Sequence, residues 1–155
     1  DYQALKACGE KMKEILNDLD KLNAFHPYCS LDKWIEDARK MGDSPQLKDY
    51  YEKNARNLIT TWGGSLNDYA SRSWAGLISD YYSKRWEVYI NTFINAVGEG
   101  VTVDQKQLEN KLKEIEESWV NATERKNTRK DVHLTTGGLL SFSAFLFSKY
   151  QRLVK

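Results

Sequence analysis

Cysteine, proline and histidine are scarce in this 155-residue chain, which holds two of each. Proline interrupts helices, so this low number is compatible with a largely helical protein. His26 and His133 stand far apart, and neither belongs to a pattern with metal-ligand spacing. The sequence therefore predicts no metal site and no cofactor.

The chain also lacks an excess of charge and a long apolar run. Its net charge of +1 does not favour nucleic acid or an anionic membrane as a partner. No run reaches the roughly 18 apolar residues of a membrane span. The start Asp-Tyr-Gln has no initiator Met, so we expect a fragment of a longer protein.

The two cysteines are not expected to form a disulfide. If Cys8 lies on a helix that ends near Leu22, it stands about 20 Å from the following loop at 1.5 Å per residue. A disulfide needs Cα atoms within about 7 Å of each other. We therefore predict that Cys8 and Cys29 are two buried free thiols.

What the chain does have is apolar residues at three- and four-residue steps along most of its length, the pattern of amphipathic helices. Ser44-Pro45 is the clearest start signal, because Ser caps a helix and Pro suits its first position. No strand alternation is sustained. We predict one all-α domain over residues 1–155, a bundle of six or seven helices with short loops. The predicted helices are 2–22, 31–41, 45–62, 66–81, 83–97, 105–119 and 135–146. The fourth and fifth of these could be one kinked helix.

Motifs for known chemistry are missing. The chain has neither a Gly-x-Ser-x-Gly elbow nor a Gly-rich phosphate loop after a strand. Paired carboxylates do occur, but acids on a helix face are usually solvated charges, and we expect this of Asp18/Asp20, Asp49/Glu52 and Glu116/Glu117. The basic run from Arg125 to Lys130 is expected to be a solvated loop. No residue is assigned a catalytic role.

The segment from Tyr50 to Trp86 concentrates aromatic rings, and two interpretations of it are open. Residues at helical spacing are expected in the core: Tyr51, Leu58, Trp74, Leu77, Ile78, Tyr81, Trp86, Ile90 and Phe93. Trp62, Leu66 and Tyr69 differ, because they flank the Gly63-Gly64 turn, where side chains can project from a helix end. A ring exposed there, beside Asp68, suits stacking on a sugar. Core and sugar site both remain possible for these three residues.

Two long motifs resemble the C-terminal helical region of the α-N-acetylglucosaminidases, glycoside hydrolase family 89. They are Tyr51-Glu52-x-Asn54-Ala55-Arg56-Asn57-x-Ile59-Thr60-x-Trp62-Gly63 and Leu66-x-Asp68-Tyr69-Ala70-x-Arg72-x-Trp74-x-Gly76-Leu77. Asp80-Tyr81-Tyr82-x-x-Arg85-Trp86 follows them. The resemblance runs from about Ile15 to Val97 and fades from about Val101.

The resemblance implies an exo-acting, retaining hydrolase of terminal α-linked N-acetylglucosamine. The family's two catalytic glutamates lie on a barrel domain that this chain lacks, so we expect the chain alone to be inactive. Its helices would pack against that barrel, a partner in the same polypeptide, and shape the sugar pocket. The resemblance assigns substrate contacts to Trp62, Leu66 and Tyr69, and makes Arg56 and Arg85 structural charges paired with acids such as Asp68 or Asp80.

By the same resemblance the parent protein would be periplasmic, secreted or lysosomal. The alternative is a free-standing helical module for protein interaction, without sugar chemistry. Exposure of Trp62 and Tyr69 at one edge of the bundle would favour the sugar pocket, and full burial would favour the plain bundle. A large exposed apolar patch is also expected if a barrel partner is missing.

Overall fold

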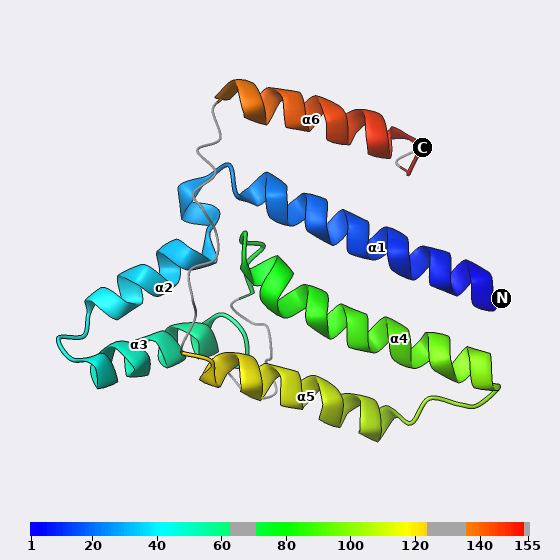
Figure 1. Cartoon of the computed structure of the whole chain (residues 1–155), viewed down its shortest axis with the longest axis horizontal. Helices are drawn as coiled ribbons and strands as arrows, with labels where there is room; N and C mark the ends of the chain where they lie inside the picture. The colour runs from blue at the N-terminus through cyan, green and yellow to red at the C-terminus, as the bar shows by residue number, and fades with distance from the viewer. Residues whose placement is uncertain (63–70, 124–135, 154–155) are drawn as a thin grey trace.

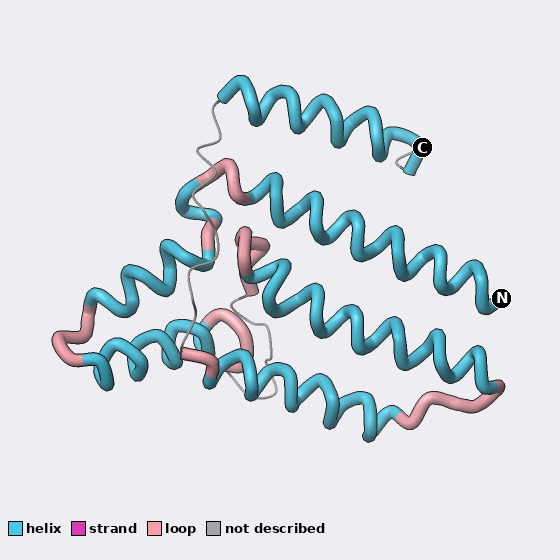
Figure 2. Tube along the Cα trace, viewed as in Figure 1, coloured by secondary structure: helices cyan, strands magenta, loops and turns pink. Residues whose placement is uncertain are grey.

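The fold is all-α, as the sequence predicts. A computed structural model describes residues 1–62, 71–123 and 136–153. Across these ranges there is no β-strand, only an isolated bridge between Ser30 and Ala75 (Figure 2). The α-helices are α1 (Tyr2–Asn23), α2 (Leu31–Lys40), α3 (Pro45–Leu58), α4 (Ser83–Glu99), α5 (Gln105–Asn121) and α6 (Thr136–Tyr150).

Four long helices form a layer, and a helix pair closes one end of it. Figure 1 shows α6, α1, α4 and α5 side by side in that order, and neighbours in this order contact one another. The antiparallel pair α2 and α3 sits at the end of α1 opposite the N-terminus, and α3 packs on α5. The chain therefore returns from α3 to the layer through the segment before α4.

Local capping signals set several helix ends. The Ser44 hydroxyl accepts a hydrogen bond from the Leu47 N–H at 3.3 Å, and Pro45 occupies the first turn of α3. The Asp104 carboxylate accepts from the Gln107 N–H at 3.0 Å at the start of α5. Gly100 ends α4 with a φ of 69°, a left-handed conformation that suits glycine. These boundaries agree with the sequence-based expectations.

The close contact of α1 with α4 depends on Gly9. Gly9 is buried, and a Cβ atom there would come within 2.7 Å of the Ile90 Cγ2 atom. Real Cβ contacts are almost never this short, so any side chain at Gly9 would push the two helices apart. The absence of a side chain thus lets the central helices of the layer meet.

The main core lies where α2, α3 and α5 meet the segment just before α4. Leu77, Ile78 and Tyr81 are buried, as expected, and the Tyr81 and Trp119 rings are 5.0 Å apart. The buried apolar cluster comprises Leu31, Ile35, Ala55, Ile59, Leu77, Tyr81, Trp119 and Val120, with Trp34 and Trp74 packed against it.

Two residues expected in the core are instead exposed. Leu58 is 41% exposed and Trp86 is 44% exposed. Helical spacing shows which residues share a face, but it does not show whether another element covers that face. The expectation for these two residues is therefore wrong.

Part of the predicted helix over 66–81 is not helical. Residues 71–74 are not helical, and residues 63–70 lie outside the described part of the chain. The Ala75 N–H donates to the Cys29 carbonyl at 2.8 Å, and the Leu31 N–H donates to the Ala75 carbonyl at 2.9 Å. These bonds form the isolated parallel bridge between Ser30 and Ala75. A π-helical turn (η3, Ile78–Tyr82) then runs directly into α4, so the fourth and fifth predicted helices join into one.

Both thiols are free, as predicted, but they are not both buried. Cys8 is exposed and Cys29 is partly buried. The prediction that both are buried is therefore wrong: the outer side of α1 at Cys8 is not covered. No described helix is long and apolar enough to cross a membrane.

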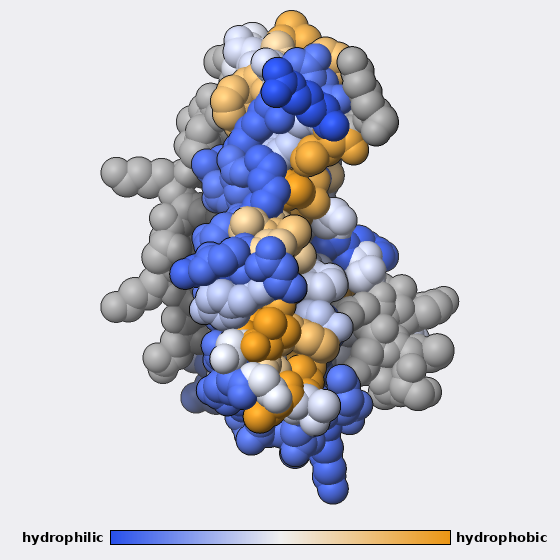
Figure 3. Space-filling model, turned by 90° about the vertical axis from the view of Figure 1, so that its right-hand side faces the viewer, coloured by the Kyte–Doolittle hydropathy of each residue, from blue (hydrophilic) through white to orange (hydrophobic). Residues whose placement is uncertain are grey.

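Apolar side chains remain exposed on α4 and α6. On α6 they include Leu140, Phe145 and Phe147, and on α4 they include Trp86 and Val97. The end of the molecule where α1 begins shows apolar groups interrupted by hydrophilic ones (Figure 3). Among the described residues on that face, the apolar groups do not join into a single continuous patch.

Candidate functional site

Trp62 stands at the end of the turn that follows α3, with 46% of its surface exposed. It is the one predicted sugar contact that falls within the described residues. Leu66 and Tyr69 lie outside them, so the structure does not show whether the three residues come together. The exposure of Trp62 agrees with a side chain that projects from a helix end.

The turn that carries Trp62 is anchored residue by residue. Ile59 and Thr60 are buried, and the Thr60 hydroxyl donates to the Arg56 carbonyl at 2.7 Å. The Thr61 hydroxyl donates to Asn57 Oδ1 at 2.6 Å. The Trp62 N–H donates to the Asn57 carbonyl at 2.9 Å. A half-exposed indole is thus presented on a firmly held backbone.

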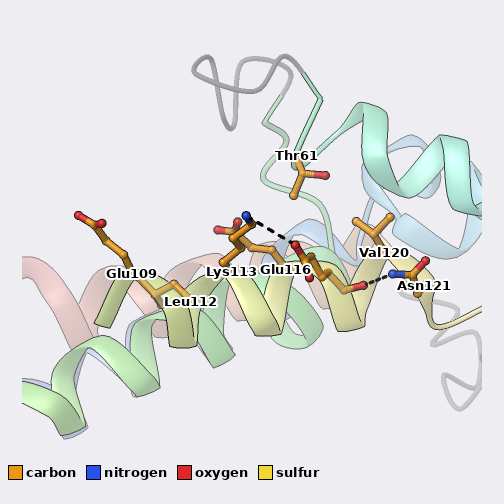
Figure 4. Close-up of a pocket in the computed structure, with 8 residues that line it drawn as sticks. Thr61, Glu109, Leu112, Lys113, Glu116, Val120 and Asn121 are labelled. Atoms are coloured by element: carbon orange, nitrogen blue, oxygen red, sulfur yellow. Dashed lines mark hydrogen bonds and ion pairs between the residues drawn. The ribbon is translucent and has the colours of Figure 1, made fainter. Parts of the chain in front are cut away.

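A groove runs beside this turn, between Thr61 and one face of α5. Its volume is about 630 Å³, and its lining mixes apolar and polar side chains. In Figure 4, Thr61 stands opposite the row of α5 side chains. The Lys113 ammonium lies 3.9 Å from Glu117, and the Asn121 amide donates to the Glu117 carbonyl at 2.7 Å. The groove is large enough for a small ligand and offers both donors and acceptors.

The paired carboxylates are not all solvated, which corrects the sequence-based expectation. Asp18, Asp20, Glu52 and Glu116 are all buried. Sequence spacing alone does not reveal their burial, because most of their partners come from distant segments, whereas Arg56 lies one turn from Glu52 on the same helix. A buried carboxylate is stable only when it is paired and hydrogen-bonded.

Each of these carboxylates has such partners. Glu52 lies between two guanidinium groups, at 2.5 Å from Arg39 and 2.6 Å from Arg56. Hydrogen bonds to Asp49 and then to Glu52 raise the pKa of Arg39 above its ordinary value, against the opposing effect of burial. The acids of this cluster are therefore engaged in structural pairs rather than facing each other across an open site.

Asp20 and Asp18 are held by other segments. The Asp20 carboxylate accepts from the backbone N–H groups of Gly76 at 2.7 Å and Ser79 at 3.1 Å. Asp18 accepts from the Lys149 ammonium at 2.5 Å and the Tyr150 hydroxyl at 2.7 Å. The first contact fixes the start of the π-helical turn, and the second attaches α6 to α1.

Arg56 and Arg85 pair with acids, as expected, but the acids that the structure shows are Glu52 and Glu116, and Asp68 lies outside the described residues. Arg56 is buried against Glu52, donates to the Trp119 carbonyl at 3.3 Å and stacks 4.6 Å from the Trp119 ring. Arg85 pairs with Glu116 at 3.0 Å. Among the described residues, no group of three metal-ligating side chains comes together.

This geometry can be compared with known proteins. Residues 1–149 match the family model described as the alpha-N-acetylglucosaminidase (NAGLU) C-terminal domain. The chain belongs to this family. The match extends on both sides of residues 15–97, where the quoted motifs lie.

Relatives of the NAGLU C-terminal domain support the assignment. The chain is 32% identical to human alpha-N-acetylglucosaminidase over 123 residues, which is 78% of this chain and 17% of the human protein. It also matches the family 89 glycoside hydrolase of Clostridium perfringens in complex with PUGNAc, with a TM-score of 0.73 and 29% identity. The same enzyme in complex with 2-acetamido-1,2-dideoxynojirmycin gives a TM-score of 0.72 and 29% identity.

Both bacterial alignments cover 96% of this chain and 18% of the bacterial chain. In these relatives, the NAGLU C-terminal domain is thus a small part of a much longer polypeptide. The chain described here spans less than a fifth of the length of the relatives that it matches.

Sequence reasoning missed the roles of Asn57 and Asp20. In the sequence, Asn57 is one of several polar residues among the aromatic rings and has no feature that distinguishes it. The available signal was an Asn in the last helical turn before Thr-Thr-Trp, because Asn favours local hydrogen bonds where a helix ends. For Asp20 the only signal was an acid within the apolar face of α1, which gives no indication of its partner at Gly76.

Proposed function

We propose that this chain is the helical domain of an exo-acting, retaining α-N-acetylglucosaminidase. In this proposal it packs on a catalytic barrel of the same polypeptide and forms one wall of the pocket for a terminal N-acetylglucosamine. Trp62, with Leu66 and Tyr69, makes the contacts with the sugar. The observation that carries the proposal is the half-exposed Trp62 indole on its anchored turn, in a chain of the NAGLU C-terminal domain family.

Two further observations support the proposal that this domain lines the sugar pocket without supplying the catalytic groups. The buried acids Asp18, Asp20, Glu52 and Glu116 are all engaged by internal partners. A retaining glycosidase needs two carboxyl groups about 5 Å apart across the scissile bond, available to the substrate. In our proposal, these two groups come from the barrel. The bacterial relative binds a 2-acetamido compound, which is compatible with an N-acetylated amino sugar as the ligand.

The test is substitution of Trp62 by Ala in the full-length enzyme. We expect kcat/KM for an aryl α-N-acetylglucosaminide to fall about 5- to 30-fold, the factor that ~1–2 kcal/mol of lost contact gives. The melting temperature should change little, because the indole is half exposed. Trp86→Ala is the matched control, since Trp86 is similarly exposed on α4.

Equal loss of activity in both variants, or unfolding of Trp62→Ala, would contradict the assignment of Trp62 to the pocket. The chain alone, shown to be folded by circular dichroism, is expected to give no turnover of the same substrate. Clear turnover by the chain alone would refute the proposal that the catalytic acids lie on another domain.

A further inference from the structure

Asn57 forms three hydrogen bonds to the three residues that lead to and include Trp62. Its carbonyl oxygen accepts from the Thr60 N–H at 3.1 Å and from the Trp62 N–H at 2.9 Å. Its side-chain Oδ1 accepts from the Thr61 hydroxyl at 2.6 Å. A single residue in the last turn of α3 thus contacts each residue from Thr60 to Trp62.

The residues at the start of this turn are themselves held in place. Thr60 is 1% exposed and is held by the Arg56 carbonyl, while the Arg56 side chain pairs with Glu52 in the core. Because the turn is fixed at Thr60, the direction in which the chain leaves it depends on the next contacts. Two contacts follow Thr60: the Trp62 N–H bond to the Asn57 carbonyl and the side-chain bond between Asn57 and Thr61, and only the second can be removed by changing a side chain.

We propose that Asn57 is a positioning residue, which orients the Trp62 indole for the sugar through its bond to Thr61. This inference rests on the function proposed above. Asn57 itself acts through Thr61 and the backbone of Trp62. A binding residue must be held within about 0.5 Å of its productive position, and hydrogen bonds from supporting residues supply that restraint.

Isosteric variants in the full-length enzyme isolate this bond. Asn57→Leu removes the acceptor at nearly constant size, and Thr61→Val removes the donor in the same way. Asn57→Asp keeps an oxygen acceptor for the Thr61 hydroxyl. Asn54→Leu is the matched control, because Asn54 is an exposed asparagine one turn earlier on the same helix.

We expect Asn57→Leu and Thr61→Val each to raise KM for the aryl α-N-acetylglucosaminide about two- to tenfold, the range that loss of one hydrogen bond gives. The double variant should be no worse than either single variant, because both remove the same bond. Asn57→Asp should keep KM near that of the wild type. Asn54→Leu should change neither KM nor kcat.

The Trp62→Ala variant serves to distinguish a positioning role of Asn57 from a purely structural one. If Asn57 acts by orienting the indole, adding Asn57→Leu to Trp62→Ala should raise KM no further. An additive effect would overturn the inference. If Asn57→Leu does not fold, Thr61→Val alone and in the Trp62→Ala background decides the question, since it exchanges one hydroxyl for a methyl group.

The two proposals fail differently. If Trp62→Ala leaves kcat/KM unchanged, the proposed function of Trp62 is wrong. If Trp62→Ala raises KM while Asn57→Leu and Thr61→Val do not, only the positioning role of Asn57 is overturned. If Asn57→Asp is as defective as Asn57→Leu, the bond to the Thr61 hydroxyl is not the restraint, and the inference is again overturned.

Discussion

The Asp20 carboxylate on α1 accepts a hydrogen bond from the backbone N–H of Gly76 at 2.7 Å, across 56 positions of sequence. The same oxygen accepts from the Ser79 N–H at 3.1 Å. One buried acid therefore caps the helical segment that continues into α4, as a capping residue would if it came from the chain just before it. It also joins the layer of long helices to the segment that returns from α3.

Replacing Asp20 by Ala should destabilise the fold. Two N–H groups would lose a charged acceptor, and hydrogen bonds to charged groups contribute about 1.5–3 kcal/mol each. We expect the free energy of unfolding in urea to fall by about 3–6 kcal/mol, the sum for the two bonds. Asp20→Asn keeps an oxygen acceptor and should lose clearly less. Equal losses in the two variants would show that the capping bonds are not the source of the stability.

Removing Glu52 should be far more costly than removing a surface acid. Glu52 is 1% exposed and lies between Arg39 and Arg56, so Glu52→Ala leaves buried positive charge without its partner. Breaking a buried pair in this way typically costs about 3–5 kcal/mol.

Glu36→Ala is the control for this prediction. Glu36 pairs with Lys40 at 2.6 Å, but both side chains are more than 60% exposed. Exposed pairs of this kind contribute less than about 1 kcal/mol. Denaturant unfolding of both variants tests the contrast, and similar losses at Glu52 and Glu36 would contradict it.

Gly9→Ala should destabilise the chain although alanine is the better helix former. The new Cβ would meet Ile90 Cγ2 at 2.7 Å, and forcing a methyl group into a packed interface costs about 1–3 kcal/mol. In an Ile90→Ala background the clash is gone, and Gly9→Ala should then stabilise by up to about 1 kcal/mol. Thermal unfolding of the four proteins of this cycle measures the change of sign, and its absence would show that the close approach does not limit residue 9.

Attachment of α6 to α1 should weaken in acid. Burial alone would raise the pKa of Asp18, but hydrogen bonds from Lys149 and Tyr150 hold it below its ordinary value. Hydrogen bonds from Lys11 and then Lys149 likewise lower the pKa of Glu14. A lowered carboxyl pKa gives stability that is present above the unfolded value and is lost as the pH falls through the folded value.

Lys149, which pairs with Asp18 and Glu14, should make the attachment of α6 to α1 weaken in alkali as well. Hydrogen bonds to Asp18 and then Glu14 raise the pKa of Lys149, so the contribution of Lys149 to stability is complete below the ordinary value of 10.5 and is lost as the pH rises through the folded value.

The acid limb is the one to measure. Melting temperatures measured from pH 7 down to about pH 2 should converge for the wild type and Asp18→Asn, because protonation of Asp18 removes the charge that the variant lacks. A difference that does not depend on pH would contradict this account.

The sequence alone determines the features that depend on near neighbours along the chain. The cap at Ser44 with Pro45, the cap at Asp104 and the glycine end at Gly100 each act within a few residues, so composition and spacing predict them. The all-α class follows from the same periodicity. The long motifs around Trp62 likewise identify the family, because they are contiguous stretches of sequence.

Only the tertiary structure decides which faces and charges are covered. Residues 71–74 are not helical, and the bonds of Ala75 to Cys29 and Leu31 join segments that no local pattern brings together. Asp20 and Glu52 are buried because Gly76, Arg39 and Arg56 come to them from other turns and segments, and Trp86 stays exposed because no described helix covers it. Burial depends on contacts between distant parts of the chain, whereas capping and periodicity act within a single helix.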